Sequence, residues 1–381
     1  MAGYIFALGK DDPLSIYERC AKDGVYSTSL FTLSSIPFEG TLADYSTMKE
    51  GDNVYFFFER KIYGIGTLKN IGKDCKYSNY LCSNIPKHFY YNDIKNHLLV
   101  DYGPQSTLNR WICCFSPSPY FFRQGVDMDD ILVYKPNTFK MLRAFWKTSF
   151  IKISDEENRS LKEIIMLRNK DAVTAPTSNN ILEGNSILHE KIKNTVCDQH
   201  LIDIKHVLDA CNTKNHIRHE MAIEAATLHQ LSRDPNTVFG KWDYLSHQVP
   251  ASPFKPIDYM DKIDIFGYRF IDGTDIVSKY LVIEIKKGTA DISAITQLAK
   301  YVDWVCKEYA YGDYSALEGY ILAYDYTEEA IRKKNDICVR QYTQGSHPIE
   351  NKEWIDIKLI KYSYDDGCLQ YTEEQIGRAH V

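Results

Sequence analysis

Hydrophobic and polar positions alternate over short runs in the amino-terminal third of the chain, and turn residues separate these runs. Such alternation is typical of β-strands, which we predict at residues 4–8, 54–59, 61–68, 110–115 and 130–133. The polar pair Arg60-Lys61 between two of the runs predicts a β-hairpin. Helical spacing occurs at residues 14–21 and 137–148. Short strands with few helices favour a small, strongly curved sheet or barrel.

The pattern changes after residue 150. Apolar residues at helical spacing predict an amphipathic helix over 155–167, with Ser154 as its N-cap. Residues 172–185 have no apolar period and contain several Thr, Pro, Ser, Asn and Gly residues, so we interpret them as an interdomain linker. Two further helical stretches follow, at 186–196 and 200–211.

Strands alternate with helices in the carboxy-terminal half. We predict helices at 219–231 and 291–309 and strands at 242–248, 262–270, 279–286, 319–324 and 355–362. This order predicts a mixed sheet flanked by helices. The predicted fold class is therefore α/β, in which a mixed carboxy-terminal sheet accompanies an amino-terminal α+β domain with a small β-barrel.

Composition limits the functional classes. A length of 381 residues favours two domains. No apolar run approaches the ~20 residues that cross a bilayer, and the amino terminus has no secretory pattern, so we expect a cytoplasmic protein without a membrane partner. The net charge of −6 means that a polyanion would need a local groove.

Metal-binding cysteine motifs are not evident. None of the 10 cysteines forms a C-x-x-C pair, so the sequence predicts no zinc knuckle. His216, His219 and His229 lie on or near one predicted helix, but no second cluster completes a zinc site with them. We therefore expect these histidines to be surface or capping residues.

One group of residues has the pattern of a catalytic site. Asp264 lies on a predicted strand, and Glu284-Ile285-Lys286 follows on the next one. Because alternate residues of a strand share a face, Glu284 and Lys286 point to the same side, and a hairpin can place Asp264 beside them. Two carboxylates and the Ile285 carbonyl would give oxygen ligands for Mg²⁺ or Mn²⁺.

The sequence around this group also predicts its surroundings. Gln297 and Tyr301 are spaced i and i+4 on the following helix, so both can face the sheet. Charged residues on a strand more often form a solvated face than a metal site. The neighbouring residues are apolar, however, which predicts a buried strand whose charged groups need partners; these neighbours are Leu281, Val282, Ile283 and Ile285.

These motifs resemble the PD-(D/E)xK nuclease superfamily, and in particular the nuclease domain of NucS-type endonucleases. The resemblance covers about residues 216–325, including the run from Gln297 to Val305. It implies that Asp264 and Glu284 bind a divalent metal, that Lys286 orients water, and that Gln297 positions water or phosphate. It also implies a glutamate from the preceding helix, for which Glu224 fits best and Glu220 is the alternative.

The amino-terminal region loosely resembles PUA-like domains of the EVE and ASCH type, through residues 51–57 and 63–67. This resemblance implies a pocket that reads a flipped base. Candidate substrate contacts are Trp111, Trp146, Arg110, Arg123 and, in the other half, Tyr301.

We therefore predict a PUA-like reader at 1–170, a linker with helices at 171–215 and a nuclease domain at 216–374. Residues 375–381 match the translation of a common sequencing adapter, and we expect an artefactual tail. The predicted function is metal-dependent endonucleolytic hydrolysis of DNA, in prokaryotic defence or modification-dependent restriction. The alternatives are a catalytically inactive DNA-binding protein and a ligand-regulated effector nuclease. Paired cuts would favour a homodimer, but no residue demonstrates one.

Overall fold

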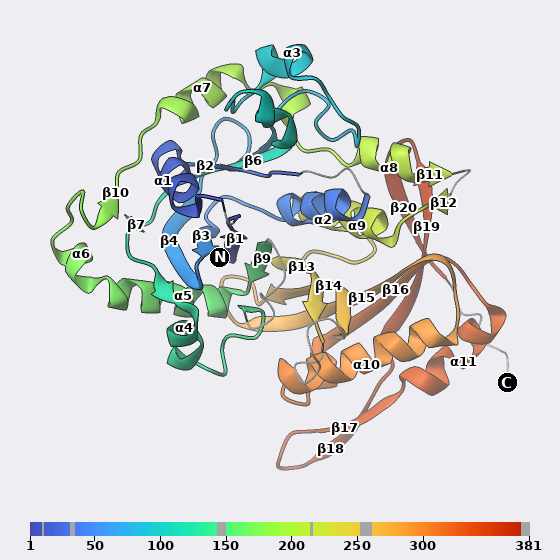
Figure 1. The fold of residues 1–381 in the computed structure, drawn as a ribbon. Coiled ribbons are helices and arrows are strands. Elements are labelled where there is room, and N and C mark those ends of the chain that lie inside the picture. Colours follow the sequence, from blue (N-terminus) through green and yellow to red (C-terminus); the bar gives the residue numbers. More distant parts are fainter. Residues whose placement is uncertain (10, 31–34, 143–149, 214–215, 252–260, 375–381) are drawn as a thin grey trace. The chain divides into compact units, whose positions relative to one another are not determined.

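The computed structural model describes residues 1–9, 11–30, 35–142, 150–213, 216–251 and 261–374. The chain divides into two compact units (Figure 1). The amino-terminal unit comprises Met1–Leu33 and Met48–Ile202, and the carboxy-terminal unit comprises Ser34–Thr47 and Asp203–Val381. A segment from the first part of the chain, which contains helix α2 (Ser35–Ser46), thus belongs to the carboxy-terminal unit.

The amino-terminal unit is built on a mainly antiparallel sheet. Its strands have the order β2-β6-β4-β3-β1-β9, with β5 paired to β6 and β8 paired to β4. Among the described strands of this sheet, only β1 and β3 pair in parallel. The bounds are β1 Gly3–Ala7, β2 Val25–Ser27, β3 Asn53–Phe58, β4 Lys61–Leu68, β5 Lys76–Ser78, β6 Trp111–Pro117, β8 Val126–Asp127 and β9 Phe150–Ile153. The helices are α1 Pro13–Asp23, α3 Tyr91–Ile94, α4 Met128–Tyr134, α5 Asp155–Arg168, α6 Lys170–Thr174 and α7 Ile187–Thr195.

Local sequence explains where this unit follows the predictions and where it departs from them. Strands β3 and β4 form the predicted hairpin, but its turn is Glu59-Arg60, and both residues have positive φ of 49° and 60°. Residues 130–133, predicted as a strand, lie in helix α4 because the Asp127 side chain caps it by accepting from the Asp129 amide. Of the predicted helix at 137–148, residues 137–141 form turns and bends, and 143–149 lie outside the described residues.

The expected linker at 172–185 is part of the amino-terminal unit. Its strand β10 (Ile181–Leu182) pairs with β7 (Phe121–Phe122). The Arg123 amide also donates to the Asn180 carbonyl at 3.0 Å. Its polar composition therefore reflects a turn-rich packed segment.

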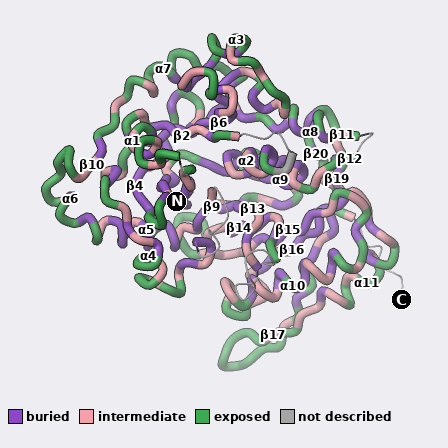
Figure 2. The backbone as a smooth tube through the Cα atoms, viewed as in Figure 1, coloured by how far each residue is buried: buried purple, intermediate pink, exposed green. Residues whose placement is uncertain are grey.

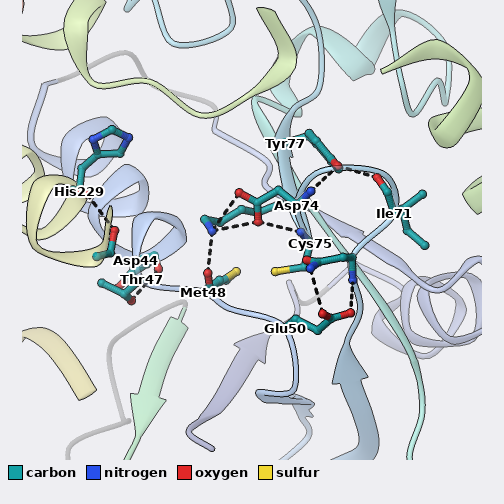
Figure 3. A network of polar contacts seen from close by, with 12 residues as sticks. Asp44, Thr47, Met48, Glu50, Ile71, Asp74, Cys75, Tyr77 and His229 are labelled. Atoms are coloured by element: carbon teal, nitrogen blue, oxygen red, sulfur yellow. Dashed lines mark hydrogen bonds and ion pairs between the residues drawn. The ribbon is translucent and has the colours of Figure 1, made fainter. Parts of the chain in front are cut away.

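Polar side chains hold the loops of this unit in place (Figure 3). The Asp74 carboxylate accepts from the Cys75 amide at 2.7 Å and pairs with Lys76 Nζ at 3.1 Å. Lys76 Nζ also donates to the Met48 carbonyl at 2.7 Å. The Tyr77 hydroxyl accepts from the Asp74 amide at 2.7 Å and donates to the Ile71 carbonyl at 2.5 Å. Asp74 therefore has a structural role, because its carboxylate and amide connect neighbouring parts of this loop.

The carboxy-terminal unit contains a six-stranded mixed sheet of order β13-β14-β15-β16-β19-β20. The pairs β15/β16 and β16/β19 are parallel and the others antiparallel. The bounds are β13 Tyr244–Pro250, β14 Lys262–Phe270, β15 Val277–Ala290, β16 Leu317–Tyr326, β19 Ile357–Asp365 and β20 Cys368–Glu373. The predicted α/β class is confirmed, and each strand predicted in this half is present.

Helices position the central strands of this sheet. Helix α10 (Ile292–Glu308) connects β15 to the parallel β16 and packs on both, and α9 (Glu220–Arg233) packs on β15 as well. Figure 1 shows β15 between these two helices. Asp291 caps α10 by accepting from the Ser293 amide. Helices α8 (Lys205–Cys211) and α11 (Glu328–Cys338) and the short hairpins β11 (Asn212–Thr213)/β12 (His216–Ile217) and β17 (Arg340–Gln344)/β18 (Glu350–Trp354) complete the unit.

Burial follows the sheet. Leu281, Val282, Ile283 and Ile285 of β15 are buried, as the apolar run predicts. Figure 2 shows this burial along the central strands, whereas the tip of the β17/β18 hairpin is exposed. Among the described helices, none has the length and apolar character required to cross a bilayer.

Candidate active site

The site begins where strands β14 and β15 stop pairing. Their register joins Ile265 to Ile283, which brings Asp264 next to the start of the Glu284-Ile285-Lys286 segment. The Ile285 amide donates to Asp264 Oδ2 at 2.7 Å. Beyond this pair, the Ile285 amide bonds to a side-chain carboxylate of β14 and not to a backbone carbonyl of that strand. The bond fixes the Asp264 carboxylate beside the backbone of Glu284.

Lys286 joins Glu284 to helix α10. Lys286 Nζ lies 2.6 Å from Glu284 Oε1 and donates to Gln297 Oε1 at 3.4 Å. Gln297 Nε2 in turn donates to the Tyr301 hydroxyl at 2.9 Å. The four side chains form one connected polar chain. Tyr301 is buried at its end, so it supports Gln297 directly.

Glu224 reaches the same site from helix α9. It is buried, whereas Glu220, one turn earlier, is exposed and accepts from the Lys287 amide at 3.2 Å. Gln248 Nε2 lies 3.0 Å from Glu224 Oε2 and 3.4 Å from Asp264 Oδ1. One nitrogen atom thus contacts two carboxylates, and the geometry supports Glu224 over Glu220 as the helix acid.

The structure also identifies a partly buried histidine, with 12% of its side chain exposed, behind Glu224. His247 Nδ1 lies 3.1 Å from Glu224 Oε1, and His247 Nε2 lies 2.7 Å from Asp44 Oδ1 on helix α2. Burial opposes protonation, but attraction to Asp44 and Glu224 outweighs it and raises the pKa of His247 to about 10. His247 is therefore an imidazolium at neutral pH and orients Glu224 by its charge and its hydrogen bond.

The clustered acids destabilise one another's charged forms. Burial, followed by repulsion from Glu284 and Glu224, raises the pKa of Asp264 well above its usual value. Burial raises the pKa of Glu284 to about 7, although Lys286 opposes this shift. Burial also raises the pKa of Glu224. The site thus concentrates negative charge that a cation would relieve.

This donor set fits a divalent metal. Glu284 Oε2 is buried and has no hydrogen-bond partner among the described residues. Leaving such an atom unpaired is costly, and a carboxylate oxygen is the ligand that Mg²⁺ and Mn²⁺ prefer. Asp264 and Glu284 would hold the ion. The Ile285 carbonyl stays a predicted ligand.

The predicted base-reading residues lie in the amino-terminal unit, and two of them are structural. Trp111 is 0% exposed, and its indole Nε1 donates to Asn84 Oδ1 at 2.7 Å. This burial corrects the prediction that Trp111 stacks on a base, because neither face of its ring reaches solvent. Arg110 is also buried, and it donates to the carbonyls of Ser83, Ile85 and Lys87. Its guanidinium fixes that loop and does not face a phosphate.

Of the remaining two, Trp146 lies outside the described residues. Arg123 is 43% exposed and pairs with Glu18 at 2.5 Å. It lines an open polar pocket of the amino-terminal unit together with Gln124, Arg168, Asn169, Asp171, Ala172, Asn179 and Asn180.

Sequence reasoning missed Gln248, His247 and Asp44. Gln248 stands opposite Asp264 in the β13/β14 register, but its positive φ of 52° takes it out of the ladder. Neither that conformation nor the docking of α2 leaves a periodic signal in the sequence.

Comparisons with known proteins give limited, local likenesses. No protein-family model matches the chain, and no curated protein matches it. A repair endonuclease from Pyrococcus abyssi aligns at 27% identity over 29% of this chain and 41% of that one, with a TM-score of 0.21. The structure of an EndoMS–double-stranded DNA complex aligns at 26% identity over 20% of this chain and 28% of that one, with a TM-score of 0.16. The chain thus spans less than half of either structure.

Proposed function

We propose that this protein is a metal-dependent endonuclease that hydrolyses DNA phosphodiester bonds. The observation that carries the proposal is the cluster of the partly buried Asp264 and Lys286 around the buried Glu284, one oxygen of which has no partner among the described residues. The large majority of buried side-chain polar atoms have at least one hydrogen-bond partner. This cluster leaves an acceptor free and crowds three carboxylates, which supports a metal site.

Asp264 and Glu284 would bind the ion, and the bound ion would supply Lewis-acid activation of water and phosphate. Burial lowers the basicity of Lys286, but its bond to Glu284 outweighs this and raises the pKa of Lys286. The amine is therefore protonated at neutral pH. It can donate to the attacking water and counter the negative charge that develops on phosphate.

Two further groups have positioning roles in this proposal. Gln297 holds Lys286 from one side, and its amide is held by Tyr301. On the other side, His247 fixes one oxygen of Glu224, which leaves the other oxygen directed to Gln248. Gln297 with Tyr301, and His247, restrict the conformations of Lys286 and Glu224, respectively. Residues that contact the groups around a metal usually contribute in this way.

The biological role that we propose is prokaryotic defence or modification-dependent restriction. The amino-terminal unit would supply specificity. Arg123 is its one described candidate that remains exposed, and with Arg168 it lines the polar pocket described above. We propose this pocket as a contact for nucleic-acid phosphate.

The proposal is tested with supercoiled plasmids, unmodified and modified, in Mg²⁺ or Mn²⁺ and in EDTA. We expect nicked or linear products only with the metal, and faster cleavage of modified DNA. A gel shift without cleavage in either metal would contradict the nuclease proposal and favour an inactive DNA-binding protein. Cleavage that requires an added nucleotide, regardless of modification, would instead favour a ligand-regulated effector.

A further inference from the structure

A second group of side chains that could hold a metal ion lies in the carboxy-terminal unit and shares no residue with the candidate active site. Glu39 of helix α2, Cys211 at the end of α8 and His219 just before α9 meet there. Glu39 Oε1 lies 3.0 Å from Cys211 Sγ and 2.9 Å from His219 Nδ1. Cys211 Sγ and His219 Nδ1 are 3.6 Å apart. Three different donor types, oxygen, sulfur and nitrogen, thus face one point.

The local fold holds Cys211 and His219 together. The hairpin between them pairs Asn212 with Ile217, and the Arg218 amide donates to the Cys211 carbonyl at 3.0 Å. His219 occupies the N-cap position of α9, where side chains usually accept from the first helical amides. Its side chain makes no capping bond and contacts Glu39. The histidine is therefore directed to the cluster at the expense of a helix cap.

The cluster is incompletely satisfied without a cation. Glu39 has a side-chain exposure of 2%, and its Oε2 is buried with no hydrogen-bond partner among the described residues. A buried carboxylate beside a thiol costs free energy unless a positive charge compensates it.

We propose that Glu39, Cys211 and His219 bind a Zn²⁺ ion. Zinc is borderline soft and takes S, N and O ligands together, whereas Mg²⁺ prefers oxygen alone. Binding breaks the S–H bond of Cys211 and releases the proton to solvent, so that a thiolate coordinates the ion.

The sulfur–nitrogen separation fits this ion, whereas the two separations to Glu39 Oε1 are shorter. Zn–S bonds of about 2.3 Å and Zn–N or Zn–O bonds of about 2.0–2.1 Å place tetrahedral ligand atoms about 3.3–3.6 Å apart. The observed sulfur–nitrogen distance of 3.6 Å agrees with this range. Glu39 Oε1 is closer because it is hydrogen-bonded to both partners, and these two bonds would be replaced by bonds to the ion. His219 has a side-chain exposure of 31%, so water can supply the fourth ligand.

A zinc ion here would join α2 to α8 and α9. Helix α2 also carries Asp44, the partner of His247 behind Glu224. The site would therefore hold the helix that orients an acid of the candidate active site, without contacting substrate. Its primary role is structural, and its existence does not depend on nuclease activity.

The test measures metal binding by the full chain. Protein purified without a metal-affinity step and dialysed against metal-free buffer should retain about one zinc per chain by mass spectrometry. Co²⁺ added to the zinc-free protein should give a thiolate-to-cobalt charge-transfer band. Cys211→Ala should abolish the band, and Cys306→Ala, which removes another buried thiol of the same unit, should leave it unchanged.

A variant of the same shape separates loss of zinc binding from loss of folding. Glu39→Gln keeps the shape of the side chain and should weaken zinc affinity by about 10- to 100-fold or more, with an unchanged circular dichroism spectrum. A wild-type protein with no zinc and no charge-transfer band would overturn the proposal. So would a band of equal intensity in folded Cys211→Ala. Plasmid cleavage can fail or succeed in either case, so the two proposals are tested separately.

Discussion

Two buried glutamates, one in each unit, differ in how their carboxylate oxygens are satisfied. Glu157 and Glu284 are each 1% exposed. Glu157 accepts from the Met141 and Leu142 amides through one oxygen and from the Ser154 amide through the other. Glu284 is paired through one oxygen only, to Lys286, and its other oxygen has no partner among the described residues.

Burial raises the pKa of both glutamates, but the opposing influences differ. Backbone amides compensate Glu157, and these donors are fixed by the fold. Glu284 is compensated by the Lys286 side chain, and its charged form is further destabilised by Glu220 and Glu224. A raised pKa alone therefore does not distinguish the two roles. Complete satisfaction by backbone amides indicates structure, and crowding with a free oxygen indicates a binding site.

The largest expected effect is the loss of cleavage when Lys286 is removed. Lys286→Ala should lower the initial rate of plasmid nicking by about 10²- to 10⁴-fold, because it removes the amine that we propose to orient water and to counter phosphate charge. The matched control is Lys287→Ala, which removes an exposed lysine one residue away. Equal losses in both variants would show that general charge, and not Lys286, supports cleavage.

His247→Gln should have a smaller effect on the same assay. The variant removes the cation that orients Glu224, so we expect a 10- to 100-fold lower rate and a higher Mg²⁺ requirement. The rate is measured as a function of Mg²⁺ concentration, which gives the Mg²⁺ midpoint and the maximal rate separately. A loss of positioning changes the midpoint, whereas general instability lowers only the maximal rate. His206→Gln, at an exposed position of the same unit, should behave like the wild type. An unaltered Mg²⁺ midpoint in His247→Gln would contradict the positioning role.

Replacing each glutamate by glutamine should change the stability of the protein in opposite directions. Glu157→Gln places an amide opposite backbone donors and should destabilise the fold by about 1–3 kcal/mol. Glu284→Gln removes a charge from a crowded cluster, so the metal-free protein should melt at a higher temperature above about pH 7. Calorimetry in EDTA measures both. A strong destabilisation by Glu284→Gln would assign Glu284 the structural role of Glu157.

The smallest expected effect is the pH dependence of stabilisation by Mg²⁺. The folded protein raises the pKa of Glu284 from 4.5 to about 7, so it binds this proton more tightly than the unfolded chain does. That contribution is fully present below the unfolded value and is lost as the pH rises through about 7. Mg²⁺ competes with the proton. It should therefore raise the melting temperature more at about pH 8 than at about pH 5.5, and an effect that is constant with pH would contradict this linkage.

The sequence predicts the acidic core of the site better than its surroundings. Asp264, Glu284 and Lys286 lie on strands, where a period of two determines which side chains share a face. Gln248 reaches the site through a left-handed backbone, and Asp44 reaches it through the docking of a distant helix. Tertiary contacts of this kind have no periodic signature.

Histidines and aromatic residues illustrate the same limit. His219 has no ligand partner at a recognisable spacing in the sequence, because Glu39 comes from α2. Trp111 was predicted to contact a base, but the residue types of a core and of a pocket are alike in a β-rich domain. The fold of the carboxy-terminal half could be predicted because its apolar runs are long, whereas the short runs around residue 130 fit both a strand and a helix.

Anomalous diffraction from a Mn²⁺-soaked crystal tests the central claim most directly. We predict an anomalous peak within about 2.0–2.3 Å of carboxylate oxygens of Asp264 and Glu284, with Lys286 Nζ beside it and outside its coordination sphere. A crystal in which these carboxylates bind no Mn²⁺ at concentrations that support cleavage would contradict the proposed site.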